Sequence, residues 1–512
     1  MNRNKPFQFP PDLPIMNTRF TLLFPALLAA MPFLAQPGAL DPTFGTGGYV
    51  VDPTLSPAVS VAVYPDGRIV ASSGPSLYMY MPDGTLAAGF GTGGVLASLG
   101  ISAGKVLIQP DGRILAGGLI NAGGVDIAVA RYAEDGTPDA SFGTDGIAQV
   151  ALPNFDYFNG MTLLDDGRVL VTGTWNIADS PALLVMLNPD GTPDDTFGTS
   201  GQVQWVPEAG DDFKAYDAAV QQDGAIVFSG FHSAQADDDF VARFTPTGAV
   251  DNTYNGTGML YLDFGPNNDE VVQVELDAQG RAILLATASS ASSFHSGSLA
   301  RVNTDGTLDL TFGTDGILPL NSATSTYVPT SFIVQADGKL VVTGATMGGT
   351  SAARELFVSR YTADGVLDPD FGDAGYSILA LPEKESGLAI AATSEGKLVV
   401  AGQSHITGEV PDLLLARFWQ DSGVLVSGMP QQGDLLTVLP CPVTTSFTIA
   451  SSVPFTPTTK LEILDMTGRQ LMLPYWYMPE GFLVDAASLP AGMYIARVHS
   501  HEGSRSARFQ KH

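Results

Sequence analysis

The feature that most constrains this chain is a segment that occurs seven times and is divided between the two ends. Each copy has a turn glycine, and in the first six copies an aromatic pair (Phe-Gly in five of them, Tyr254-Asn255 in the fourth) and another glycine follow at fixed distances. The seventh copy stops after its turn glycine, whereas residues 38–48 hold the continuation without a preceding strand. A closed ring needs complementary half-repeats at its ends. The turn glycines are Gly84, Gly136, Gly191, Gly248, Gly306, Gly365 and Gly423.

A second marker alternates with the first and predicts a β-hairpin. It is an apolar run, a turn ending in glycine that is usually Asp-Gly, and a second apolar run, as in residues 106–117. Asp-Gly between apolar runs is a strong hairpin signal, because glycine accepts a positive φ without steric cost. The runs are too short for helices. The hairpin glycines are Gly67, Gly112, Gly167, Gly224, Gly280, Gly338 and Gly396.

Each repeat therefore holds about four strands, and four-stranded units repeated around an axis are propeller blades. We predict an all-β protein with a seven-bladed β-propeller over residues 36–425, closed by pairing of its N- and C-terminal strands. The alternative is an open β-solenoid, which requires capped ends rather than complementary half-repeats.

A charge pattern accompanies the turn glycines. An arginine lies five residues before the glycine at Arg131, Arg243, Arg301 and Arg360, and an aspartate three residues after it at Asp139, Asp194, Asp251, Asp309 and Asp368. Arg417 in the last strand would find its aspartate in Asp41. Either each arginine pairs with its aspartate, or each aspartate caps its own turn and the arginine is solvated. The first copy has Met79 and Ala87 instead, and the third has Met186.

Composition excludes some functions. The net charge of −29 argues against a nucleic-acid partner, because phosphates require lysine and arginine. An acidic surface more often serves solubility than a specific partner. Cys441 is the one cysteine, so no internal disulfide can form.

The N-terminus resembles an export signal. Arg19 precedes an apolar run over residues 20–34, which is too short to span a bilayer. We expect residues 1–35 to be a signal peptide, with Met16 as a plausible true start. No later apolar stretch reaches 18 residues, so we expect no transmembrane segment in the mature chain.

The two alternating motifs resemble those of the delta-60 repeat family. They are Leu-Asp-x-x-Phe-Gly-x-x-Gly and Pro-Asp-Gly-Arg-Ile-Leu-x-x-Gly, and the likeness covers residues 38–425. Departures include Tyr254-Asn255 for Phe-Gly and Gln279-Gly280 for Asp-Gly. The resemblance implies a β-propeller and no known activity.

Residues 433–512 read as short alternating strands with glycine turns, which suggests a small C-terminal β-sandwich. The segments 460–469 and 489–498 resemble a type A C-terminal sorting domain of the type IX secretion system of Bacteroidota. This resemblance implies that the type IX machinery is a partner and that the protein is secreted or held on the outer surface of a Gram-negative bacterium. Residues 426–432 would be the linker.

We predict no catalytic, cofactor-binding or metal-binding residue and no cofactor. His232, His295 and His405 follow hairpins, and we expect them to face solvent in variable loops. Asp211-Asp212 and residues 237–239 lack the spacing of a calcium loop, so solvated charge is the preferred interpretation. Cys441 has no basic neighbour and is expected to be inert. Trp175 and the cluster at residues 475–477 are candidates for sugar contact.

The leading function is therefore a secreted or cell-surface scaffold that binds protein or glycan through its variable loops. The rival is a propeller-type polysaccharide hydrolase or lyase with its site at the central channel, and a third reading is a structural surface component without a specific ligand. The sequence does not decide whether the protein is an enzyme, because propellers host both binding and catalysis. Titratable residues converging on the channel would favour the enzyme, and exposed aromatic side chains on one face would favour binding.

Overall fold

The computed structural model describes residues 36–511 except 122–123, 151–154, 177–179, 209–210, 234–237, 265–267, 290–294, 321–325, 348–353, 406–409, 422–435, 440–445, 452–459, 466–468, 472, 479–480, 491 and 501–502. The expected signal peptide, the expected linker and Cys441 lie outside the described residues. The chain divides into two compact units, residues 34–423 and a second unit that includes residues 424–512. Among the described residues, no helix is long and apolar enough to cross a membrane.

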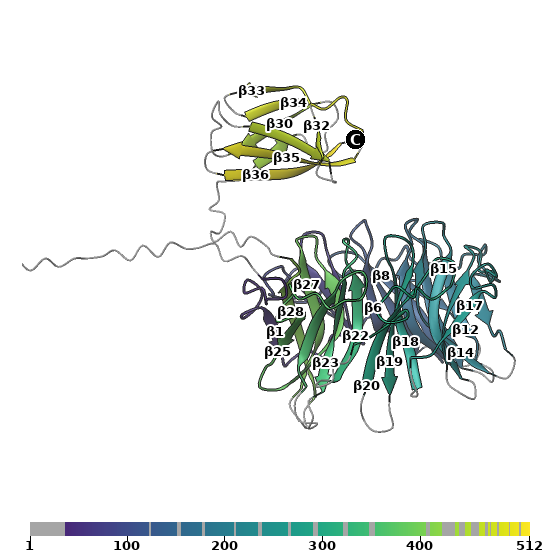
Figure 1. Cartoon of the computed structure of the whole chain (residues 1–512). Helices are drawn as coiled ribbons and strands as arrows, with labels where there is room; N and C mark the ends of the chain where they lie inside the picture. Colours follow the sequence, from purple (N-terminus) through teal and green to yellow (C-terminus); the bar gives the residue numbers. More distant parts are fainter. Residues whose placement is uncertain are drawn as a thin grey trace, which may run out of the picture. The chain divides into compact units, whose positions relative to one another are not determined.

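The first unit consists of seven four-stranded antiparallel sheets, here blades 1–7 (Figure 1). Blade 1 is β2 (Ser60–Val63), β3 (Ile69–Ser73), β4 (Ser76–Tyr80) and β5 (Val95–Ala97); blade 2 is β6 (Ser102–Ile108), β7 (Ile114–Asn121), β8 (Val125–Tyr132) and β9 (Ile147–Val150). Blade 3 is β10 (Phe155–Leu163), β11 (Val169–Asn176), β12 (Ala182–Leu187) and β13 (Gln202–Trp205); blade 4 is β14 (Asp212–Val220), β15 (Ile226–Ser233), β16 (Asp238–Phe244) and β17 (Met259–Leu262). Blade 5 is β18 (Asn268–Leu276), β19 (Ala282–Ser289), β20 (His295–Val302) and β21 (Ile317–Pro319); blade 6 is β22 (Thr326–Val334), β23 (Leu340–Met347), β24 (Leu356–Tyr361) and β25 (Tyr376–Leu379). Blade 7 is β26 (Lys384–Ala392), β27 (Lys397–His405), β28 (Asp412–Trp419) and β1 (Tyr49–Asp52).

The blades form a closed ring, which confirms the seven-bladed β-propeller. The first strands of consecutive blades contact one another around the whole circle, from β2 through β26 and back to β2. A hydrophobic cluster lies between every two neighbouring blades, including blades 7 and 1, where Phe44, Leu413 and Leu415 pack against Ile69 and Tyr78. Each blade therefore buries both of its faces only because it has a neighbour on each side.

The ring is closed by the two ends of the chain, as the half-repeats predict. Strand β1 pairs antiparallel with β28, so that Tyr49 lies opposite Ala416 and Asp52 opposite Leu413. An isolated bridge joins Leu40 to Phe418. The open solenoid is excluded by this pairing.

The hydrogen bonds between neighbouring blades show which glycine serves as the turn glycine of blade 7. In every blade, the residue that follows the aromatic residue of the Phe-Gly motif is a glycine or, in blade 4, Asn255. Its backbone N–H donates to a backbone carbonyl in the turn of the next blade, at 2.7 to 3.0 Å. In blade 6 the acceptor is Pro37, so Gly38 takes the place of the seventh turn glycine. The repeat count named Gly423 at this phase and found its continuation at residues 38–48; Gly423 lies outside the described residues.

The turn glycines are required by both their φ and their surroundings. The φ values of the six turn glycines that the structure describes lie between +79° and +88°, and that of Gly38 is +84°. A Cβ atom on Gly38 would lie 2.7 Å from the backbone nitrogen of Gly372, and one on Gly84 would lie 2.7 Å from that of Gly45. The constant spacing of the motif therefore reflects close packing of one blade's turn on the preceding blade.

The arginines and aspartates make both interactions that the sequence left open. In each pair, Oδ2 of the aspartate accepts a hydrogen bond from the arginine Nε at 2.8 Å, while Oδ1 caps the aspartate's own turn. Arg301, Arg360 and Arg417 are 1%, 2% and 4% exposed, so the solvated alternative is wrong for these arginines. The five pairs are Arg131–Asp139, Arg243–Asp251, Arg301–Asp309, Arg360–Asp368 and Arg417–Asp41.

Each of these arginines also ties its blade to the next one, and we call the arrangement the arginine latch. The guanidinium lies 4.6 to 4.8 Å from the centre of the aromatic ring of its own repeat, a cation–π distance. It also donates to a backbone carbonyl in the turn region of the following blade: Pro189, Thr304, Ala363, Gln420 and, from Arg417 to blade 1, Pro82. Arg417 thus joins both chain ends and the first blade.

A second cation supports the aspartate of the latch and was not predicted. It follows the hairpin glycine, as Arg281 does beside Asp309 at 2.9 Å and Lys397 beside Asp41 at 3.2 Å. In blade 3, where Met186 stands at the position of the latch arginine, Arg168 forms the ion pair with the aspartate instead, with its Nη1 2.9 Å from Oδ2 of Asp194. Burial alone would raise the pKa of Asp309, but hydrogen bonds from Thr311 and the charge of Arg301 lower it to about 2.

The described residues from 436 onward, here called the tail, form two four-stranded antiparallel sheets. One contains β29 (Leu436–Leu439), β30 (Ser446–Ser451), β34 (Gly481–Asp485) and β33 (Tyr475–Met478), and the other β32 (Gln470–Leu471), β31 (Lys460–Asp465), β35 (Gly492–Ser500) and β36 (Gly503–Lys511). A single cluster of buried side chains draws on both sheets, including Ile449 and Phe482 from one and Ile463 and Ala496 from the other.

Candidate functional site

Two groups of polar side chains do not follow the repeat and are the candidate sites. One lies in the central channel, which the first strands of the seven blades enclose. The other lies on the variable face, defined here as the end of the ring where the second and third strands of each blade are connected. The opposite end, which carries the hairpins and latches, is called the hairpin face.

The channel group joins blades that are not neighbours. Lys105 on β6 of blade 2 places its Nζ 3.0 Å from Oδ1 of Asp217 on β14 of blade 4. Val274 of blade 5 donates its N–H to the other oxygen of Asp217 at 3.3 Å. Because blade 3 separates blades 2 and 4, this ion pair reaches across the channel.

Glu275 on β18 completes the channel group. Burial and the neighbouring charge of Asp217 raise its pKa to about 7, although Lys105 and Gln273 act in the opposite direction. Gln273 donates to Oε1 of Glu275 at 3.4 Å. The channel therefore holds a lysine–aspartate pair beside a carboxyl group whose charge changes near neutral pH.

β-Bulges place these side chains in the channel. The register of β6, β14 and β18 shifts just before Lys105, Asp217 and Gln273 respectively. A bulge re-aims the side chains that follow it. Sequence analysis missed this group, because its members come from three different repeats and a bulge has no clear signal in a single sequence.

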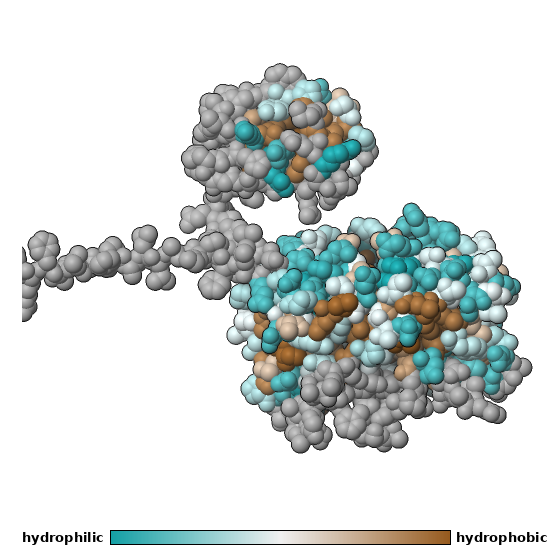
Figure 2. Space-filling model, in the orientation of Figure 1, coloured by the Kyte–Doolittle hydropathy of each residue, from teal (hydrophilic) through white to brown (hydrophobic). Residues whose placement is uncertain are grey.

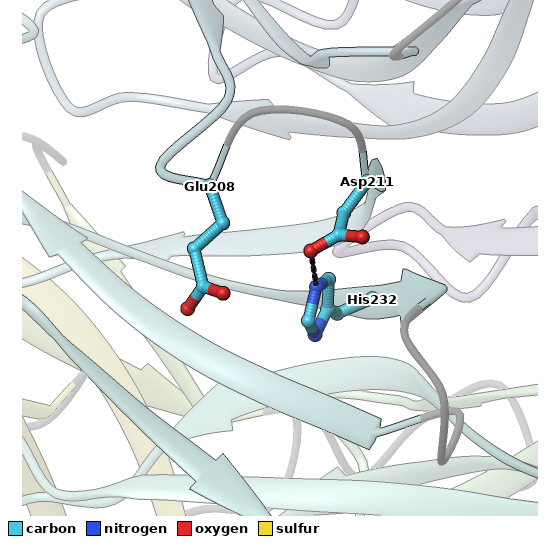
Figure 3. Close-up of side chains that lie close together, drawn as sticks. All are labelled: Glu208, Asp211 and His232. Atoms are coloured by element: carbon cyan, nitrogen blue, oxygen red, sulfur yellow. Dashed lines mark hydrogen bonds and ion pairs between the residues drawn. The ribbon is translucent and has the colours of Figure 1, made fainter.

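The second group combines two carboxylates with an imidazole (Figure 3). Glu208 and Asp211 lie on the connection from β13 to β14, and His232 lies near the end of β15. Their potential ligand atoms all lie within 4.8 Å of one another. Nε2 of His232 is 3.1 Å from Oδ2 of Asp211, and the hydroxyl of Tyr261 donates to Oε1 of Glu208 at 2.9 Å.

The imidazole is held by the core of blade 4. His232 is 3% exposed, and its ring stacks on Phe213 with centroids 4.3 Å apart and planes 20° apart. The two residues lie opposite each other in the pairing of β14 with β15. Phe213 in turn packs against Trp205, with ring centroids 5.6 Å apart. The expectation that His232 faces solvent is therefore wrong.

The other sequence candidates do not join either group. Asp212 accepts the N–H of Ser180 at 2.8 Å, and His405 is half-buried at the end of β27. Trp175 is half-buried on β11, and Tyr475 in the tail is 47% exposed. The side chains of His295, Asp237 and Trp476 lie outside the described residues.

A hollow marks blade 1, which lacks both the arginine and the aspartate of the latch. With Met79 and Ala87 in place of the arginine and aspartate, a space of about 760 Å³ lies between blades 1 and 2 on the hairpin face. Arg68, on its rim, pairs with Asp66 at 2.7 Å and with Glu134 of the next blade instead. This hollow follows from the missing latch and has a structural origin.

Comparison with known families supports a β-propeller. A profile described as a β-propeller domain of unknown function (DUF5122) matches residues 109–142, 164–197, 283–312 and 335–371. Each matched segment ends at the aromatic residue of a Phe-Gly pair. No curated protein matches the chain at a significant level.

Several solved structures are similar at low sequence identity. A polysaccharide lyase, an ulvan lyase, is 12% identical with a TM-score of 0.44 over 76% of this chain and 96% of its own. A protein of unknown function from Dyadobacter fermentans is 11% identical with a TM-score of 0.39, covering 74% and 99%. The Nup133 β-propeller domain from Vanderwaltozyma polyspora is 8% identical with a TM-score of 0.35, covering 73% and 98%. With TM-scores this low, none of these likenesses carries an argument about activity or ligand.

The raised pKa of Glu275 predicts a specific pH dependence. Between the ordinary value of 4.5 and the raised value of about 7, the folded protein keeps a proton that the unfolded chain has lost, so this group lowers stability as pH rises. We expect Glu275→Gln to raise the free energy of unfolding at pH 8 by roughly 1–3 kcal/mol and to change it little at pH 4.5. Urea denaturation of the full chain at both pH values measures this effect.

The control is Glu395→Gln, which removes a carboxylate from an exposed hairpin of blade 7. Parallel stability curves for wild type and Glu275→Gln over this pH range would contradict the assignment.

Proposed function

We propose that this protein is a secreted or cell-surface β-propeller that binds an extracellular protein or glycan through its variable face. The repeat is assigned to the delta-60 type on its sequence motifs. The proposal goes beyond the propeller fold itself and is supported by the unequal use of the ring's two faces.

The polar groups of the hairpin face mainly make contacts that join neighbouring blades. It contains the arginine latches, the aspartate-capped turns and the hydrogen bonds between neighbouring turns. In Figure 2 the rim of the propeller at this end is mostly hydrophilic, and hydrophobic residues gather midway along the outer wall. A face whose polar groups already have partners within the ring has fewer of them free for a ligand.

The variable face carries large apolar and aromatic side chains that are exposed to solvent. Tyr157 near the start of β10 is 50% exposed, Tyr261 near the end of β17 is 37% exposed, and Val410 before β28 is 78% exposed. Tyrosines are well suited to binding, because they offer a large apolar surface and a hydroxyl group at a low cost in conformational entropy. This pair of exposed tyrosines on the variable face carries the proposal.

A second candidate function is a polysaccharide hydrolase or lyase in the channel, and Glu275 favours it. A carboxyl group with a pKa of about 7 suits general acid catalysis. Glycoside hydrolysis requires a second free carboxylate, however, and Asp217 is already paired with Lys105 and with the N–H of Val274. The geometry therefore supports a strut across the channel better than an active site.

We expect the full chain to bind one class of purified polysaccharide or bacterial surface protein saturably. Tyr157→Ala should weaken that binding about tenfold or more, as the loss of an aromatic anchor does. Leu310→Ala is the matched control, because Leu310 is 66% exposed but lies on the hairpin face. Binding assays with immobilised ligands measure both variants.

Two outcomes would speak against binding by the variable face. One is equal loss of affinity in the Tyr157→Ala and Leu310→Ala variants. The other is release of polysaccharide fragments by the wild-type chain and loss of that turnover in Glu275→Gln, which would favour the channel enzyme.

The export route is part of the proposal and rests on the motifs of residues 433–512. If these residues are a type IX sorting domain, their deletion in the producing bacterium should leave the propeller inside the cell envelope instead of outside. Fractionation and immunoblotting locate the protein, and deletion of the linker residues 426–432 alone is the control for shortening the chain. Undiminished secretion of the protein lacking the tail would contradict this route.

A further inference from the structure

We propose that Glu208, Asp211 and His232 form a binding site for a divalent transition-metal ion of the zinc type. The site lies on the variable face, where the chain passes from blade 3 to blade 4 (Figure 3). This inference concerns a metal site and does not depend on the identity of the ligand proposed above.

The donor set selects the class of metal. One imidazole nitrogen and two carboxylate oxygens are ligands that zinc accepts, whereas calcium takes oxygen ligands. In the sequence, Asp211 and its neighbour Asp212 lack the spacing of a calcium loop, and solvated charge was the preferred interpretation. The structure instead brings Asp211 next to a histidine and turns Asp212 towards the N–H of Ser180.

The geometry requires only a small contraction. The potential ligand atoms lie within 4.8 Å of one another. A tetrahedral zinc ion with bonds of about 2.0–2.2 Å holds its ligands roughly 3.4 Å apart. The side chain of Glu208 is exposed, and its polar contact among the described residues is the hydrogen bond from Tyr261, so it can supply most of this movement.

The imidazole is already oriented for coordination. His232 is more than nine-tenths buried and stacks on Phe213, and its Nε2 points at the carboxylate of Asp211, with the carboxylate of Glu208 to one side (Figure 3). Its other ring nitrogen, Nδ1, has no hydrogen-bond partner among the described residues. The ring is therefore fixed by packing, and its one hydrogen bond is to a residue that would itself be a ligand.

The charges around the site also favour a cation. Two carboxylates lie close together, and among the described residues no lysine or arginine lies within 4.0 Å of either of them. Like charges at this separation repel each other unless a cation lies between them. Tyr261 donates to Glu208, a contact of the kind that orients metal ligands from outside the coordination shell.

Three protein ligands leave zinc with an open coordination position. Because Glu208 is exposed, that position would face solvent on the variable face. A bound metal ion would also link the connection between blades 3 and 4 to the core of blade 4.

Calorimetric titration of the full chain, without a polyhistidine tag and freed of metal by chelation, with zinc chloride tests the site. We expect one saturable site that His232→Gln weakens at least about 100-fold and Glu208→Gln about 10-fold or more. His405→Gln is the matched control, because it removes a half-buried histidine at the corresponding end of β27. The tail histidines His499, His501 and His512 are present in every variant, so the differences report on the cluster alone.

Glu208→Gln keeps the proposal testable even if His232→Gln fails to fold, because Glu208 is exposed. The absence of saturable zinc binding in the wild-type chain would overturn the proposal, and so would unchanged affinity in the Glu208→Gln variant. Competition of zinc by an excess of calcium would contradict the assigned class of metal.

Discussion

The rest of the structure depends on the contact between each blade and the next. A blade of four short strands has two apolar faces, and both are covered only when it has a neighbour on each side. In five of the seven blades the arginine latch adds to this contact, because one guanidinium joins an aspartate and an aromatic ring of its own repeat to a carbonyl of the following blade. We attribute most of the stabilisation to the hydrophobic clusters, to which the latch adds a directional, charge-assisted contact.

Closure makes the same contact between the two ends of the chain. Blade 7 takes its outer strand from residues 49–52 and its turn from Pro37 and Gly38, so a chain that lacked either end would leave one blade incomplete. Arg417 reaches Asp41, from the N-terminal segment, and Pro82, from blade 1. Since a single cysteine permits no internal disulfide, non-covalent contacts of this kind must hold the circle together.

The sequence predicted the ring well, because a repeat imposes the same contacts many times. Even the pairing of Arg417 with Asp41, 376 residues apart, could be predicted from the pattern within the other repeats. The sequence analysis treated the ion pair and the turn cap as alternatives, but a carboxylate has two oxygens and can make both. In Asp309, Oδ2 accepts from Arg301 and Oδ1 accepts from the backbone N–H of Thr311. The sequence named both Gly38 and Gly423 at this phase of the repeat, because counting repeats does not show at which residue one end of the chain replaces the other in blade 7.

The candidate sites could not be predicted in the same way, because they depart from the repeat. Lys105 meets Asp217 only because the ring curves, and bulges in both strands turn them to the channel. His232 was expected in solvent, although the alternation of β15 places it on the same face as Phe228, and both faces of this strand are buried. Nothing in the sequence marks Glu208 as a possible ligand, because it lies in the loop between β13 and β14, outside the repeated motifs.

Hydrogen–deuterium exchange of the full chain tests the central claim, ring closure, most directly. If β1 completes blade 7, amides of residues 49–52 should exchange as slowly as those of the other outer strands, such as β13. Arg417→Ala should accelerate exchange in β1 about tenfold or more while leaving β13 unchanged. Rapid exchange of residues 49–52 in the wild-type chain, with the remaining blades protected, would contradict closure by the two chain ends.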